Sequence, residues 1–257
     1  MPRNKNIKKI YIQHSSFNDK QAFKIKRFIR QIIFFILFRN ISLIIRVSDK
    51  TLPEFFSPHK IKTIYNGVPL KNLKYTNKSP VFSKRIKLLM VGSINKNKNQ
   101  SLAIDIIREQ KDLELTLVGE GELKNNLIKA NQDLIKSGRL IFTGSQKEIR
   151  KYYLKSHILL VLSNNEGLPF VILEAMSYGL PVIANDVGGI KEVINNYHNG
   201  VIISNNDFKS ILKSINNLKS NKETYKFISK NARESIKQEY NTVKMFNKLL
   251  EYINNIN

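Results

Sequence analysis

Two glutamates, Glu166 and Glu174, are the residues whose type and spacing are most suggestive of chemistry. Glu166 follows the apolar run 157–162, which is typical of a buried strand. Glu174 is the one charged residue between Pro169 and Tyr178, a segment that predicts a short, almost wholly buried helix. Because a buried carboxylate is costly unless something donates a hydrogen bond to it, Glu174 needs a partner.

The partner could be internal, such as an arginine or a helix-cap amide, and for an isolated buried glutamate this would suffice. Two features favour an external ligand here. Glu166 lies in the loop before the predicted helix, where backbone amides and the helix dipole favour a phosphate. Paired carboxylates also occur in glycoside hydrolases, but a phosphate-type loop argues against that class. The pattern indicates a ligand that carries both hydroxyls and phosphates.

Composition restricts the other classes of site. The 257 residues include no cysteine and four scattered histidines, which excludes disulfides and thiolate metal sites and suggests no metal cluster. Such a composition suits a reducing cytoplasm. We find no secretory signal, and the longest apolar run, 32–38, is too short to span a bilayer. The sequence therefore predicts a protein that is not integral to the membrane.

Positive charge is concentrated at the front of the chain. Residues 1–100 carry 22 Lys and Arg against 3 Asp and Glu, within a formal net charge of +23. Such a field attracts an anionic membrane leaflet, nucleic acid or a phosphorylated substrate. The alternative is a solvated, lysine-rich surface without a partner.

The first 80 residues predict strands at 9–13, 42–47 and 61–65, with helices at 20–38 and 49–56. The polar stretch 71–83 follows as a linker. Helix 20–38 begins with basic residues and ends in an apolar run. This pattern suits a helix in a membrane interface, and equally one that packs its apolar end into a domain core.

From residue 86 onward, strands alternate with helices, which predicts an α/β fold with a parallel, doubly wound sheet. Ligands bind such sheets at the carboxyl ends of the strands, where Gly92, Gly119, Gly144 and Glu166 all fall. The predicted strands are 86–91, 113–118, 140–142, 157–162, 181–184 and 201–203; the predicted helices are 99–109, 123–136, 148–154, 169–178, 208–218 and 222–256.

A longer pattern surrounds the two glutamates. Glu174 is followed by Ala175-Met176-x-x-Gly179-x-Pro181-Val182-x-Ala184-x-Asp186-Val187-Gly188-Gly189-x-x-Glu192-Val193-Ile194. With Glu166 eight positions before Glu174, this run resembles the Glu-x7-Glu donor-site signature of the retaining, two-domain (GT-B) glycosyltransferases of family 4.

The resemblance implies two Rossmann-like domains. Residues 81–257 would form a complete C-terminal, nucleotide-sugar-binding domain whose terminal helix crosses back to the other domain. Residues 1–80 would form a partial N-terminal, acceptor-side domain with its linker. In the family the N-terminal domain is about as large as the C-terminal one. We therefore expect a family member that is shortened at its N-terminus.

The resemblance also assigns roles to individual residues. The segment from Gly92 and Ser93 to Lys98 matches a family segment in which an Arg and a Lys bind the donor diphosphate. Lys98 matches the Lys, whereas Ser93 stands where an Arg is frequent, so leaving-group stabilisation should be weaker. Gly119 lies in a Gly-x-Gly turn that faces the donor site. Lys124 replaces the third glycine of a dinucleotide-binding fingerprint there, which argues against NAD.

Within the signature itself, the family implies that Glu174 binds the nucleotide ribose hydroxyls and Glu166 the hydroxyls of the donor sugar. The backbone amides of Gly167 and Leu168 would lie near the sugar and diphosphate. His14 follows the first strand, where many members carry a histidine close to the donor sugar. It is the catalytic candidate, although a lone histidine at a strand end can also be structural.

The resulting prediction is a cytoplasmic, retaining glycosyltransferase at the inner face of the cell membrane, in bacterial surface polysaccharide or lipopolysaccharide synthesis. Its partners would be a nucleotide sugar and a glycan or lipid-linked acceptor, without metal or redox cofactor. The alternative is a non-catalytic nucleotide-sugar-binding remnant, or half of a split transferase that needs a separate N-domain chain. A nucleic-acid partner is not expected, because no binding module accompanies the charge.

Overall fold

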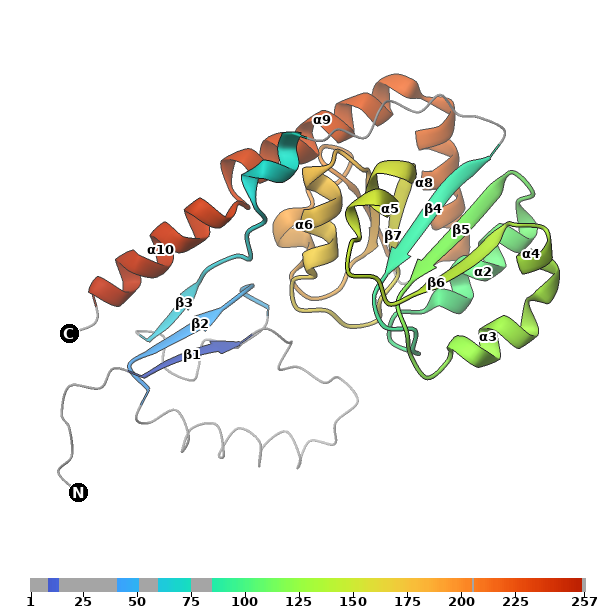
Figure 1. Ribbon diagram of the computed structural model, residues 1–257. Helices are drawn as coiled ribbons and strands as arrows, with labels where there is room; N and C mark the ends of the chain where they lie inside the picture. The colour runs from blue at the N-terminus through green and yellow to red at the C-terminus, as the bar shows by residue number, and fades with distance from the viewer. Residues whose placement is uncertain (1–8, 14–40, 51–59, 75–84, 205, 256–257) are drawn as a thin grey trace.

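The computed structural model describes residues 9–13, 41–50, 60–74, 85–204 and 206–255. These residues form two parallel sheets, one of three strands from the first part of the chain and one of six strands from the larger part (Figure 1). The predicted α/β class with parallel sheets is confirmed. The predicted domain boundary near residue 80 lies outside the described residues, as do His14 and helix 20–38.

The six-stranded sheet has the order β6-β5-β4-β7-β8-β9, and every pair is parallel. The first strand of this sheet, β4, lies in its middle. Strands β5 and β6 follow on one side of β4, and β7, β8 and β9 on the other. The loops after β4 and β7 therefore meet at a topological switch point, the usual place for a ligand in such a sheet. The strands are β4 (Ile86–Val91), β5 (Leu113–Val118), β6 (Leu140–Gly144), β7 (Ile158–Val161), β8 (Val182–Asn185) and β9 (Val201–Ile203).

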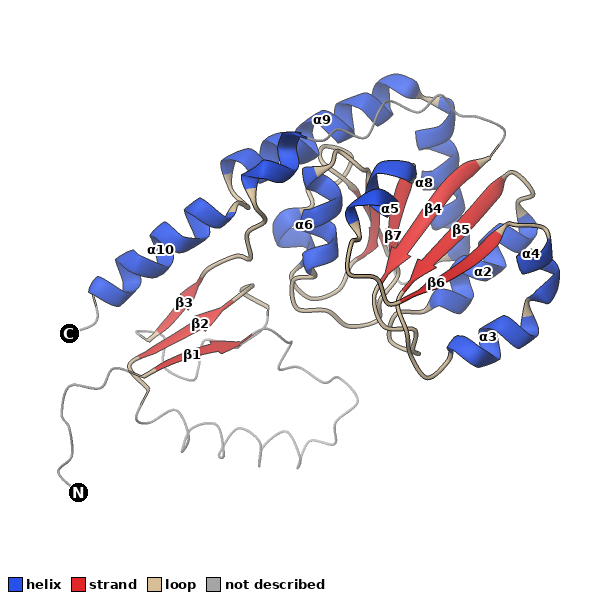
Figure 2. Ribbon diagram, viewed as in Figure 1, coloured by secondary structure: helices blue, strands red, loops and turns tan. Residues whose placement is uncertain are grey.

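Helices cover both faces of this sheet, so the strands are apolar on both sides (Figure 2). Side chains of α2 (Gln100–Glu109) and α8 (Phe208–Ser220) pack with one face. Side chains of α5 (Arg150–Lys155), α6 (Phe170–Ser177) and α7 (Ile190–Val193) pack with the other. The long helix α9 (Lys222–Gln238) contributes to both clusters.

The predicted single helix over 123–136 is wrong, because two short helices, α3 (Lys124–Ala130) and α4 (Gln132–Lys136), meet at Asn131. The backbone of Asn131 is not helical, with φ −130° and ψ 37°. Its side chain accepts a hydrogen bond from Arg108 Nη2 at 2.7 Å and donates one to the carbonyl of Leu127 at 2.8 Å. Asparagine competes with the helical backbone for hydrogen bonds, and here tertiary contacts keep it in the break.

The three-stranded sheet has the order β1-β2-β3, with β1 (Ile10–Gln13), β2 (Leu43–Arg46) and β3 (Ile61–Thr63). Its apolar face is covered by α10 (Thr242–Asn254), the last helix of the chain (Figure 1). Met245, Leu249 and Tyr252 of α10 pack against Leu43, Ile45 and Ile64. A short 3₁₀ helix, η2 (Leu70–Lys74), follows β3 and contacts α6 and α9.

The predicted single helix over 222–256 is also wrong, because the chain breaks between α9 and α10. The side chain of Asn241 caps α10 by accepting a hydrogen bond from the backbone N–H of Lys244. At the same place Val68 exchanges backbone hydrogen bonds with Tyr240 and Thr242, at 3.0 and 3.1 Å. This break lets the end of the chain turn onto the three-stranded sheet. None of the helices in the described ranges is long and apolar enough to cross a membrane.

His157 lies at the amino end of β7, opposite the ligand-binding edge. Its Nδ1 accepts a hydrogen bond from the backbone N–H of Lys87 at 2.9 Å. Burial and the nearby Lys87 lower the pKa of His157 from 6.5 to about 4. Below pH 6.5 the unfolded chain therefore binds a proton that the folded chain does not, and the folded state loses stability as the pH falls toward 4.

We predict that the free energy of unfolding falls on the order of 1 kcal/mol between pH 7 and pH 5 through His157, after a discount for its partial exposure. His157→Asn should remove this part of the pH slope, since an amide does not titrate in that range. Urea unfolding of both proteins at several pH values measures it. Equal slopes would show that His157 titrates normally in the folded chain.

Candidate functional site

Three loops converge at the carboxyl edge of the six-stranded sheet, after β4, β5 and β7. The first two touch directly: the N–H of Gly92 donates to the carbonyl of Val118 at 2.9 Å, and a Cβ on Gly119 would lie 1.9 Å from the Gly92 oxygen. Both glycines have positive φ, 139° and 145°. Only glycine fits this approach, so the two glycines predicted from sequence do lie together.

Lys98 and Glu166 meet across the switch point between β4 and β7. The distance from Lys98 Nζ to Glu166 Oε1 is 2.5 Å, and the side chains are 24% and 12% exposed. The loops that carry them are tied by backbone: the N–H of Asn164 donates to the carbonyl of Asn97 at 2.8 Å, and Asn97 Nδ2 donates to the carbonyl of Asn165 at 3.0 Å. These hydrogen bonds therefore hold the two loops that carry the ion pair in a fixed arrangement.

Lys98 lies two residues before Gln100, the first residue of α2. No side-chain hydrogen bond caps the start of that helix. Gln100 is buried at the first turn and donates from Nε2 to the carbonyl of Ser93 at 2.8 Å. Its other polar atom, Oε1, is buried and has no hydrogen-bond partner. The side chain of Ser93 is exposed. Lys98 and Gln100 line a small crevice between β4 and β7, together with Met90, Leu162, Ser163 and Val171.

The segment from Glu166 to α6 is held by its carbonyl groups. The N–H of Gly189 donates to the carbonyl of Gly167 at 2.8 Å, and Asn66 Nδ2 donates to the carbonyl of Leu168 at 3.2 Å. Gly167 and Leu168 are both buried. The segment from Glu166 to α6 is thus hydrogen-bonded to the connection between β8 and β9 and to the segment that follows β3.

Glu174 lies on α6 and has an internal partner, which the sequence argument had disfavoured. Tyr153 Oη donates to Glu174 Oε2 at 2.7 Å, and the Tyr153 ring stacks on Tyr178 with centroids 5.6 Å apart. Burial raises the pKa of Glu174, while the hydrogen bond from Tyr153 lowers it. Burial and the adjacent carboxylate raise the pKa of the Tyr153 hydroxyl, which keeps it a neutral donor. An external ligand is therefore not required to explain Glu174.

The structure thus brings Gly92, Lys98, Gly119 and Glu166 to one sheet edge, with Glu174 on the helix that follows. Sequence reasoning missed Tyr153, Gln100 and Asn66. Tyr153 lies in a predicted helix of mixed polarity, and nothing local distinguishes it from Tyr152. In the part of the chain that the structure describes, no three His, Asp or Glu side chains cluster as metal ligands would.

A second, open hollow lies over α8 and is lined by Tyr197, Lys213 and Lys219. Lys219 pairs with Asp112, which precedes β5, so this hollow faces the amino edge of the sheet. It is therefore separate from the converging loops.

Comparison with known proteins identifies the family of this region. The family model described as glycosyl transferases group 1 matches residues 72–235, which include all three loops. An uncharacterized glycosyltransferase of Haemophilus influenzae is 29% identical over 90% of this chain and 65% of its own length. An Escherichia coli UDP-Gal:alpha-D-GlcNAc-diphosphoundecaprenol alpha-1,3-galactosyltransferase is 31% identical over 76% of this chain and 54% of its own length. The chain thus spans about half to two thirds of these relatives.

Solved structures share the fold. Anabaena HepE, determined in complex with UDP and glucose, superposes with a TM-score of 0.81 at 20% identity, over 96% of this chain and 71% of HepE. TarM superposes with a TM-score of 0.80 at 22% identity, over 98% of this chain and 51% of TarM. At these identities the likeness concerns the fold alone, and it confirms the predicted GT-B type. The family match over residues 72–235 shows that the chain belongs to the group 1 glycosyl transferases.

Proposed function

We propose that this chain binds the nucleotide-sugar donor of a retaining glycosyltransferase of the family 4 type. The observation that carries the proposal is the contact between Lys98 and Glu166 across the switch point, at 2.5 Å and largely shielded from water. A cation and a carboxylate at the carboxyl edge of a parallel sheet suit a ligand that carries phosphates next to hydroxyls.

In the proposed complex the donor separates the two charges. The diphosphate accepts hydrogen bonds from Lys98 Nζ, and the hydroxyls of the sugar donate to Glu166. Each charged group then exchanges one partner for another, so neither is left unpaired in a partly buried site. The glycines at 92 and 119 keep the backbone close and leave room for the diphosphate.

Glu174 would bind the ribose of the same nucleotide. Its carboxylate is held by Tyr153 through one oxygen, so its orientation is set before the ligand arrives. A carboxylate that accepts hydrogen bonds from two neighbouring ribose hydroxyls is a common way to recognise a nucleotide. Protonation would remove the negative charge of this acceptor and turn one of its oxygens into a donor, and burial raises the pKa of Glu174. Nucleotide affinity should therefore weaken as the solution becomes acidic.

The transfer step follows from this arrangement. Lys98 would stabilise the nucleoside diphosphate as its bond to the sugar breaks, while an acceptor hydroxyl attacks the same face of the sugar, so that the configuration is retained. The departing diphosphate would accept the proton of that hydroxyl. Ser93 is exposed and adds no charge, so Lys98 would do most of this stabilisation. The acceptor we propose is a glycan or a lipid-linked glycan of bacterial surface polysaccharide or lipopolysaccharide synthesis. The E. coli relative, by its name, acts on a diphosphoundecaprenol-linked sugar, which suits this class.

Donor binding and sugar transfer are separate proposals for this chain. All residues proposed for donor binding lie between 92 and 174, within the matched family region. His14, the proposed catalytic residue, lies outside the described residues. The chain spans 65% and 54% of the lengths of the two relatives above, and sugar transfer by this chain is therefore a second proposal, distinct from donor binding.

We predict that UDP or UDP-glucose binds the purified chain, and that Glu174→Ala and Lys98→Ala each weaken it about tenfold or more, the usual effect of losing a charge-assisted hydrogen bond. Isothermal titration calorimetry measures the dissociation constants. Glu223→Ala, an exposed change on α9, is the matched control and should leave binding intact. Binding that survives both site substitutions would contradict the proposed donor site.

We also propose that the protein acts at the cytoplasmic face of an anionic membrane. On α10, Val243, Phe246 and Leu250 are each 55% exposed and lie on one face, at spacings of three and four residues. Lys244 and Lys248 lie beside them. Apolar side chains flanked by lysines suit a helix in the membrane interface, and the positive charge of residues 1–100 matches an anionic leaflet.

Vesicle sedimentation tests this proposal. The protein should bind vesicles that contain phosphatidylglycerol more tightly than pure phosphatidylcholine vesicles, and salt should weaken binding. Phe246→Ser combined with Leu250→Ser should reduce binding several-fold, on the order expected for losing two inserted side chains. Phe227→Ser, which removes a side chain of similar exposure from α9, is the control. Unchanged binding of the double variant would exclude α10 as the contact.

A further inference from the structure

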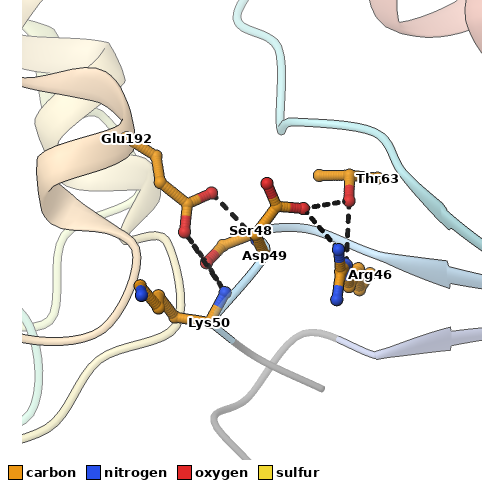
Figure 3. A network of polar contacts seen from close by, with 6 residues as sticks. All are labelled: Arg46, Ser48, Asp49, Lys50, Thr63 and Glu192. Carbon is orange, nitrogen blue, oxygen red and sulfur yellow. Dashed lines mark hydrogen bonds and ion pairs between the residues drawn. The ribbon is translucent and has the colours of Figure 1, made fainter. Parts of the chain in front are cut away.

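The carboxylate of Glu192 on α7 accepts three hydrogen bonds from the loop that follows β2, more than 140 residues earlier (Figure 3). The side chain of Tyr65, which follows β3, also hydrogen-bonds to it. Oε1 accepts from Ser48 Oγ at 2.9 Å and from the backbone N–H of Lys50 at 3.2 Å. Oε2 accepts from the backbone N–H of Asp49 at 2.9 Å. A carboxylate with three donors forms a strong, directional contact between the two sheets.

The loop that receives Glu192 is itself held in shape. Asp49 Oδ1 accepts from Arg46 Nη2 at 2.7 Å and also from the hydroxyl of Thr63 on β3 (Figure 3). Arg46 Nε donates to the same hydroxyl at 2.8 Å. This network fixes the orientation of the backbone N–H groups of residues 49 and 50 toward Glu192. The loop after β2 is therefore held rigidly on the three-stranded sheet.

Glu192 is also close to the segment that carries Glu166. Ser48, which is fully buried, lies against Gly189: a Cβ there would come within 2.3 Å of Ser48 Oγ. Gly189 donates its N–H to the carbonyl of Gly167 at 2.8 Å. Gly188, with φ 57°, passes so close that a Cβ would lie 1.8 Å from the Glu166 carbonyl oxygen. The backbone at Gly188 and Gly189 thus lies between Ser48, which binds Glu192, and the Glu166 loop.

A second tether reaches the same segment from the end of β3. Asn66 is buried and donates from Nδ2 to the carbonyl of Leu168 at 3.2 Å. The three-stranded sheet thus holds residues 164–169, the donor loop, at two points. One is Asn66 directly, and the other is Glu192 through Gly189.

We propose that Glu192 is a positioning residue, which holds the donor loop in the position where Glu166 can bind the sugar of the donor. The inference rests on the proposed function for the identity of the ligand. Glu192 itself would touch no substrate, because both of its carboxylate oxygens already accept hydrogen bonds from the loop after β2, and Tyr65 also bonds to the carboxylate. Its effect would pass through Ser48 and Gly189 to Gly167.

Hydrogen exchange tests the tether without any ligand. In Glu192→Gln the side-chain amide places a donor against backbone N–H groups, so one contact becomes repulsive. Amides of residues 164–168 and 48–50 should then exchange about tenfold faster, while those of β4 keep their protection. Ser48→Ala, a milder change at the other partner, should produce the same pattern more weakly. Unchanged exchange in 164–168 in both variants would overturn the proposal.

Calorimetry with UDP and UDP-glucose separates positioning from general damage. Glu192→Gln should leave the dissociation constant for UDP within about twofold, since Lys98 and Glu174 are untouched, and should remove the additional affinity that the glucose provides. An equal loss for both ligands would indicate only a structural role and overturn the inference. If the unsubstituted chain binds neither ligand, the proposed function fails, while the exchange measurement still decides whether Glu192 holds the loop.

Discussion

The contact between Lys98 and Glu166 depends on strand order. A sheet built in the order β6-β5-β4-β7-β8-β9 places the loops after β4 and β7 side by side, although 66 residues separate the end of β4 from the start of β7. The backbone bonds between 97 and 164–165 then hold these loops together. Because both side chains are largely shielded, each charge needs its partner or a ligand that replaces it. This constraint explains why we propose the donor site at this place.

The two sheets are joined at several points that converge on the same place. Glu192 binds the loop after β2, Asn66 reaches the donor loop, and α10 returns to cover the three-stranded sheet. The break at Asn241 is needed for that return, because Val68 pairs with the chain there. The carboxyl ends of β2 and β7 therefore face one another. Ligand sites commonly lie at interfaces of this kind, and the proposed donor site lies beside this one.

Much of this architecture could be predicted from the sequence, because the apolar strands and the glycines after them are local signals. Strand β4 was predicted with its observed bounds, and Gly92 and Gly119 were expected at the ligand-binding edge. Local patterns could not reveal that Asn131 and Asn241 interrupt helices, since both breaks depend on distant partners. Local patterns also could not reveal that Tyr153 donates a hydrogen bond to Glu174, because helix packing brings the two side chains together.

The central claim is that Lys98 exchanges Glu166 for the diphosphate of a nucleotide sugar. A crystal structure of the chain with UDP-glucose tests it most directly. We expect Lys98 Nζ on a diphosphate oxygen, the glucose hydroxyls on Glu166 and the ribose on Glu174. A complex in which the nucleotide lies elsewhere while Lys98 and Glu166 stay paired would contradict the account.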